Sequence, residues 1–195
     1  MSSVTFFYDL ESPYAWLAAE RVDALFEEAP AWVPVLLGGI FKATGRSSWA
    51  ETDARAAGIA EIQRRITVRG LPRLRLPSPW PGNSLVPMRA AVHAHAQGRG
   101  RDFALASFRL HFTEGRPLDA GDIAEAAERA GLDPSATVEA PQRQDIKDAL
   151  RANTDEARAA GVFGVPTVIV DSEVFWGDDR LEEAALTANS QTAKP

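Results

Sequence analysis

The chain has 195 residues, 45% hydrophobic and 25% charged, which suits one compact unit or a core with one inserted subdomain. A net charge of −6 argues against nucleic acid as a partner, and the absence of cysteine excludes disulfides, thiolate metal sites and redox chemistry on the protein's own sulfur. The N-terminal residues lack a secretory signal pattern, and no apolar run approaches the ~20 residues that span a bilayer, so we expect a cytoplasmic protein with no membrane partner.

The first part of the chain predicts a strand, a helix and a second strand. β-branched and aromatic residues over 4–8 predict a buried strand, and residues 32–37 predict the second. Between them, after Ser12-Pro13, apolar residues recur at the three- and four-residue spacing of an amphipathic helix: Tyr14, Leu17, Ala18, Val22, Leu25 and Phe26. Short links between these elements indicate a right-handed parallel unit.

The middle of the chain, residues 48–160, predicts an inserted helical domain. It contains no segment with strand character, and alanine-rich amphipathic stretches dominate it. We expect helices over residues 50–67, 84–97, 102–113, 120–130 and 142–160. A proline-rich loop over residues 71–82 separates the first two.

Strand character returns near the C-terminus. Residues 167–170 and 173–176, joined by a turn at Asp171-Ser172, predict an antiparallel pair, and a last helix is expected to start near Asp179. Residues 189–195 are polar, and we expect them to form a flexible tail. The pattern as a whole predicts an α/β protein, with residues 1–47 and 161–188 forming one domain around the insertion.

Ser12 is the first candidate functional residue. A helix start leaves backbone N–H groups unpaired and carries a partial positive charge, which favours a bound anion or thiolate. One charge-assisted hydrogen bond of ~1.5–3 kcal/mol together with the helix terminus could lower a thiol pKa by about 2 units. Equally, Ser12 followed by Pro13 is typical of any helix start, with serine as the N-cap and proline in the first turn.

Three segments carry a resemblance to a known family. They are residues 4–18, the Gly-Val-Phe-Gly-Val-Pro-Thr sequence at 161–167, and the Phe-Trp-Gly-Asp-Asp-Arg-Leu sequence at 175–181. They resemble the family of 2-hydroxychromene-2-carboxylate isomerases and kappa-class glutathione transferases. The resemblance spans most of the chain and implies a thioredoxin-like fold, βαβ…ββα with a large α-helical insertion as in DsbA. It also implies a homodimer, and glutathione or another low-molecular-weight thiol as the cofactor.

The resemblance assigns roles at the C-terminal motifs. It implies a cis Val165-Pro166 bond facing the active helix, with Val165 pairing with the cysteinyl part of glutathione as an added strand does. Gly177, Asp178 and Asp179 would hold the γ-glutamyl end, with Asp179 meeting its ammonium group. The alternatives are a trans proline with a structural role, and an aspartate that only caps the last helix.

Some residues near the predicted thiol site differ from the family pattern. Arg46 follows the Lys-Ala-Thr-Gly stretch where the family continues with asparagine and a later lysine, so Arg46 or Arg55 would have to meet the glycyl carboxylate. Glu11 beside Ser12 would oppose a thiolate if it pointed inward. Residues 36–45 also resemble the family, and their glycines would let the backbone pass near a ligand, although a plain turn explains them equally well.

The remaining candidates predict no rival site. His93 and His95 diverge on a helix and His111 stands alone, so we expect no metal. The arginines between residues 64 and 75 lie in a stretch that glutamates and aspartates surround, which favours a solvated helix face and loop over a phosphate-binding patch. Trp49 and Trp80 lie in loop-like stretches and could line a pocket for an aromatic substrate.

The resemblance implies a glutathione-dependent cis-trans isomerase that acts on a small-molecule aromatic, unsaturated keto acid. A thiolate stabilised by Ser12 would add to a conjugated double bond, which then rotates as a single bond before the sulfur leaves. Two alternatives remain. A kappa-like glutathione transferase would retain the adduct, and a redox-inert thioredoxin-like module would bind extended peptides at the same edge.

Overall fold

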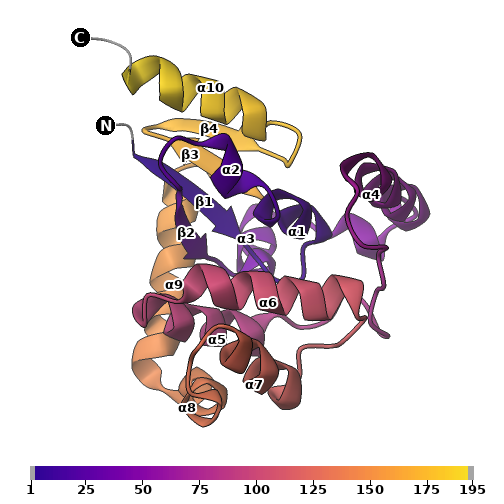
Figure 1. The fold of residues 1–195 in the computed structure, drawn as a ribbon, viewed down its shortest axis with the longest axis vertical. Helices are drawn as coiled ribbons and strands as arrows, with labels where there is room; N and C mark the ends of the chain where they lie inside the picture. The colour runs from indigo at the N-terminus through magenta and orange to yellow at the C-terminus, as the bar shows by residue number, and fades with distance from the viewer. Residues whose placement is uncertain (1–2, 193–195) are drawn as a thin grey trace.

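The computed structural model describes residues 3–192 and is built on a four-stranded sheet in the order β2-β1-β3-β4 (Figure 1). β1 (Val4–Tyr8) lies parallel to β2 (Ala31–Pro34) and antiparallel to β3 (Thr167–Val170), which pairs antiparallel with β4 (Glu173–Trp176). The two ends of the chain therefore form one sheet. The predicted α/β class and its βαβ…ββα order with a helical insertion are confirmed.

The helix predicted after Ser12 is two helices. α1 (Pro13–Ala19) ends at Glu20, and α2 (Val22–Leu25) follows Arg21, whose φ of −140° lies outside the helical range. The apolar residues on both sides of the break, such as Leu17 and Val22, are fully buried in the same core. Because the hydrophobic period continues across the break, the sequence pattern could not locate it.

Residues 36–45 form a helix, which the sequence analysis did not predict. They contain α3 (Leu37–Thr44), which ends at Gly45 in the left-handed conformation, φ 67°. Ile40 is fully buried, and a side chain at Gly39 would meet Thr154 at 3.5 Å. Packing against the core therefore outweighs the low helix propensity of two glycines.

The insertion is helical throughout its regular elements, as predicted. Its helices are α4 (Arg55–Arg69), α5 (Leu85–Ala96), α6 (Gly100–Thr113), α7 (Ala120–Arg129), α8 (Pro134–Glu139) and α9 (Gln144–Ala159). Short 3₁₀ turns cover Trp49–Glu51 and Ala140–Gln142. The sequence analysis missed α8, although Asp133 as N-cap and Pro134 at the first position are a typical helix start.

The last helix, α10 (Leu181–Thr192), packs beside β3 and β4 at the end of the molecule away from α8 (Figure 1). It begins later than expected and reaches Thr192, so residues 189–192 of the expected tail are helical. Residues 193–195 of that tail lie outside the described residues. No helix in residues 3–192 has the length and apolar character needed to cross a membrane.

A chain of aromatic rings joins the sheet to the insertion. Phe6 stacks with Tyr8 at 5.9 Å between ring centroids, and Tyr8 meets Phe108 of α6 at 6.0 Å. Phe108 then contacts Phe112 at 6.3 Å, which stacks with Trp16 of α1 at 5.7 Å. All five rings are fully buried. The sheet, the first helix and the insertion therefore share one core, which holds the start of α1 in place.

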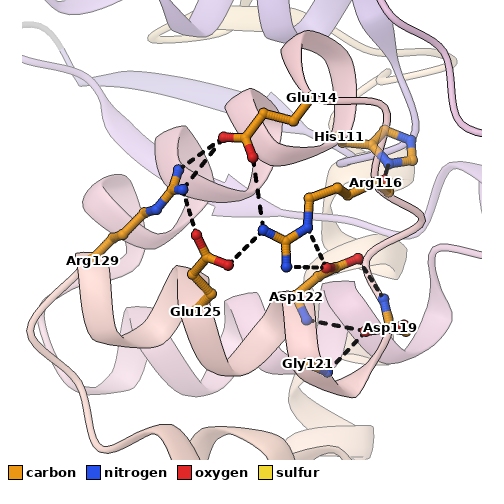
Figure 2. A network of polar contacts seen from close by, with 8 residues as sticks. All are labelled: His111, Glu114, Arg116, Asp119, Gly121, Asp122, Glu125 and Arg129. Carbon is orange, nitrogen blue, oxygen red and sulfur yellow. Dashed lines mark hydrogen bonds and ion pairs between the residues drawn. The ribbon is translucent and has the colours of Figure 1, made fainter.

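Arg116, at the corner between α6 and α7, is the centre of a network of ion pairs (Figure 2). Its guanidinium lies 2.6 Å from Asp122 and 2.5 Å from Glu125, which also binds Arg129 at 2.5 Å. The side chain of Asp122 is only 6% exposed and closes a capping box with Asp119 at the start of α7. This network fixes how the insertion turns from one helix into the next.

We expect Arg116→Met to lower the free energy of unfolding by about 2 kcal/mol, because the buried Asp122 carboxylate would lose its counter-ion. Arg143→Met is the matched control. The side chains of its pair with Asp145 are 55% and 61% exposed, and the loss of that pair should leave the free energy of unfolding nearly unchanged. Urea denaturation of both variants measures the difference. Equal effects would mean that the corner network stabilises no more than a surface pair.

Candidate functional site

Ser12 lies between the end of β1 and the first turn of α1, with 6% of its surface exposed. Its Oγ accepts a hydrogen bond from the Ala15 amide at 3.2 Å, so the predicted N-cap role is confirmed. The same hydroxyl donates to the carbonyl oxygen of Val165 at 3.4 Å, across 153 residues of sequence. Ser12 therefore caps the helix and also faces the second motif.

The Val165-Pro166 peptide bond is cis, as the resemblance implied. Gly164, just before it, is packed against Trp176, and a Cβ there would lie 2.6 Å from the indole nitrogen. On the other side, the Gly177 amide donates to the Pro166 carbonyl at 2.9 Å. The two C-terminal motifs are thus adjacent in space, and both lie beside the start of α1.

Arg46 lies next to this loop. Its guanidinium carbon is 5.0 Å from the centre of the Phe163 ring and 5.9 Å from that of Trp176. Arg55, the other candidate for the glycyl contact, instead lies over Trp80 at 5.0 Å and donates to the Ala50 carbonyl at 2.9 Å. Of the two arginines, Arg46 is therefore the one that stacks on rings flanking the Val165 loop.

The turn at Gly177 has a backbone that only glycine adopts easily. Its φ is 113°, and a Cβ would lie 2.4 Å from Oδ1 of Asp179. The side chain of Asp179 folds over this gap and remains 63% exposed. Asp178 is fully buried. The two aspartates of the motif thus differ in environment, with one carboxylate at the surface and one inside.

Asp178 is paired with two arginines that the sequence analysis assigned to a solvated face. Arg65 binds its Oδ1, and Arg69 approaches its Oδ2 to 2.5 Å. Their side chains are 18% and 19% exposed, whereas Arg64 is 63% exposed and pairs with Glu61. The expectation of a solvated face therefore holds for Arg64 and is wrong for the other two. Their i,i+4 spacing on one helix face was the available signal.

Asp9 is a buried carboxylate that sequence reasoning missed. Its side chain is fully buried and accepts hydrogen bonds from the amides of Glu11 (2.9 Å) and Leu37 (2.8 Å) and from the Ser84 hydroxyl (2.9 Å). Its backbone carbonyl accepts from the Ser12 amide at 3.0 Å. Burial raises the pKa of Asp9 to about 6, against the lowering effect of these donors. Asp9 therefore ties the strand end to the starts of α3 and α5.

Glu11, next to Ser12, is engaged by the insertion. Its Oε2 accepts from the Gly82 amide at 2.9 Å, and its Oε1 lies 3.4 Å from Nε2 of the buried His111. The other ring nitrogen of His111 is 2.7 Å from the Arg116 carbonyl (Figure 2), so that nitrogen donates. These contacts direct the Glu11 carboxylate toward the proline-rich loop and α6, and the Arg116 carbonyl is the hydrogen-bond partner of His111.

Aromatic side chains extend from the start of α1. Tyr14 meets Trp49 edge-on at 5.9 Å, and Trp49 meets Trp80 at 5.7 Å. Trp80 is 6% exposed and stands in the proline-rich loop that Glu11 holds through Gly82. The two tryptophans predicted to line an aromatic site are therefore in contact, and Tyr14 connects them to the Ser12 helix.

Comparisons with known proteins agree with this architecture. Residues 3–187 match the profile of the DSBA-like thioredoxin domain. A 2-hydroxychromene-2-carboxylate isomerase of Sphingobium xenophagum is 26% identical over 190 residues, covering 92% of this chain and 94% of its own. One of Pseudomonas putida is 25% identical over 185 residues, covering 91% and 90%. A solved structure of 2-hydroxychromene-2-carboxylate isomerase superposes with a TM-score of 0.85 at 24% identity, covering 97% of each chain.

Proposed function

The chain belongs to the DSBA-like thioredoxin domain family, and from that premise we propose that it is a glutathione-dependent cis-trans isomerase of an aromatic, unsaturated keto acid. Two relatives support an isomerase over a kappa-like transferase, because both are named 2-hydroxychromene-2-carboxylate isomerase and align with this chain over 90% or more of both lengths. The absence of cysteine removes the thiol–disulfide chemistry that the fold otherwise suggests.

One observation carries the proposal. The Ser12 hydroxyl, at the N-terminus of α1, lies 3.4 Å from the carbonyl of the residue that precedes the cis Pro166. The Ser12 hydroxyl is a hydrogen-bond donor at the positively polarised end of a helix. It lies beside the backbone of Val165, which is suited to pairing with an extended peptide that carries a thiol. Glycines at 164 and 177 are required by close packing, which keeps side chains away from this backbone.

Each part of glutathione would have a partner among the surrounding residues. Val165 would pair with the cysteinyl backbone, the carboxylate of Asp179 would meet the ammonium group, and Arg46 would meet the glycyl carboxylate. When bound, glutathione supplies a thiol nucleophile that adds reversibly to a conjugated double bond and so allows rotation. Ser12 would hold the sulfur as a thiolate, and Trp49 and Trp80 would flank the aromatic substrate.

The proposal is tested by a titration and an assay on the intact protein. We expect saturable one-site binding of reduced glutathione by calorimetry, and isomerisation of an aromatic unsaturated keto acid only when glutathione is present. Binding without isomerisation, but with a stable thioether product, would support the transferase instead. No binding up to millimolar concentrations would overturn the thiol site and leave the peptide-binding module as the alternative.

A further inference from the structure

Arg65 lies where α4 of the insertion meets the turn at Gly177. Its Nε donates to Glu61 at 2.7 Å and its Nη1 binds the buried Asp178. Its Nη2 is 3.8 Å from Oδ2 of Asp179, which is longer than a hydrogen bond. Two carboxylates therefore fix the plane of the guanidinium, while Nη2 keeps donor capacity on the side of the exposed aspartate.

The adjacent Asp179 and Arg65 present opposite charges at one edge. The Asp179 carboxylate is 63% exposed and the Arg65 side chain 18% exposed. An α-amino-acid group carries an ammonium and a carboxylate on one carbon, so it can meet both side chains at once. A guanidinium is well suited to a carboxylate because it offers parallel N–H donors in a rigid plane.

Arg65 also lies over the helix that carries Ser12. Its guanidinium carbon is 5.4 Å from the centre of the Tyr14 ring, in the first turn of α1. The Gly177 turn, which Arg65 reaches through Asp178, is joined to Pro166 by the 2.9 Å backbone hydrogen bond. Arg65 therefore contacts both the first turn of α1, which follows Ser12, and the turn at Gly177.

We propose that Arg65 determines specificity for thiols that end in an α-amino-acid zwitterion, by binding the carboxylate of that group while Asp179 binds its ammonium. This inference rests on the proposed function and deepens it, because the helical insertion then supplies part of the thiol site. Small thiols without an α-amino-acid group, and thiol peptides that lack the α-carboxylate at the γ-glutamyl end, should therefore bind poorly.

Arg65→Met and Arg69→Met form a matched pair for the test. Both arginines form an ion pair with Asp178, lie one helical turn apart on α4 and are 18% and 19% exposed, although only the Arg65 contact has hydrogen-bond geometry. Only Arg65 also approaches Asp179. Methionine keeps the helix propensity and much of the side-chain length while removing the charge. Any effect of removing a positive charge beside Asp178 should therefore appear in both variants.

Calorimetric titrations use reduced glutathione and γ-aminobutanoyl-cysteinylglycine, which lacks only the α-carboxylate. Arg65→Met should weaken glutathione binding about 10- to 100-fold, the range for a charge-assisted hydrogen bond. Arg69→Met should weaken it less than about threefold. The wild-type protein should bind the analogue as weakly as Arg65→Met binds glutathione. Arg65→Met should bind the analogue with the same affinity as the wild-type protein does.

The outcomes separate this inference from the proposed function. Equal losses in the two variants, or unchanged binding by Arg65→Met, would overturn the role of Arg65 while the thiol site stands. If Arg65→Met does not fold, the wild-type protein decides alone, since equal affinity for glutathione and the analogue would also overturn it. Failure of the wild-type protein to bind glutathione would overturn the proposed function and this inference together.

Discussion

Replacing Ser12 with alanine is expected to lower kcat of the proposed isomerisation about 100-fold while changing glutathione affinity less than about threefold. The hydroxyl would donate one charge-assisted hydrogen bond to the sulfur, and such a bond, at ~1.5–3 kcal/mol, corresponds to about 10- to 100-fold in rate. The helix terminus, which also favours the thiolate, is unchanged. The backbone groups and charges that would hold the rest of glutathione remain, so affinity should largely persist. Single-turnover kinetics and calorimetry measure the two effects separately.

Ser12→Ala also removes a helix cap, and a second variant isolates that loss. Asp133 caps α8 as Ser12 caps α1, with its Oδ1 accepting from the Ala136 amide at 2.8 Å and a proline following it. Both substitutions by alanine should reduce stability by about 1 kcal/mol. Asp133→Ala should leave kcat unchanged. If Ser12→Ala behaves in the same way, Ser12 is only a cap and its assignment to the chemistry is wrong.

The second large effect concerns pH. Asp9 has a pKa raised to about 6 by burial, against 3.8 for the exposed group, so the folded protein holds this proton more tightly than the unfolded chain. Stability from Asp9 is therefore greatest below about pH 4 and falls as the pH rises toward 6. A shift of about 2 pKa units corresponds to a loss of about 3 kcal/mol by neutral pH.

Asp9→Asn should abolish this part of the pH dependence. Asp9→Asn should also lower the stability at every pH, because the two carboxylate oxygens accept the amides of Glu11 and Leu37 and an asparagine side chain can accept only one of them. The measured quantity is the slope of the unfolding free energy between pH 4 and 7, by urea denaturation. Ser84→Ala, which removes one donor to Asp9, should extend the loss to higher pH. Identical slopes in the wild-type protein and Asp9→Asn would contradict the buried carboxylate.

Local patterns in the sequence predicted much of the fold. The strands at residues 4–8, 167–170 and 173–176 have the predicted bounds, because each is a β-branched or aromatic run closed by turn residues. Helices α5, α6 and α7 follow the apolar period closely. The break after Ala19 and helix α3 were missed, since core packing rather than propensity decides them.

Some features of the candidate site follow from local sequence, and others depend on tertiary packing. The sequence by itself determined the helix start at Ser12 and the two glycine-containing motifs, because capping and turn chemistry are local. Only the tertiary structure decided that Arg65 faces Asp178, 113 residues away, and that Asp9 is fully buried. The physical reason is that a charged side chain's partner and its burial depend on the elements packed around it, and no local period encodes which elements those are.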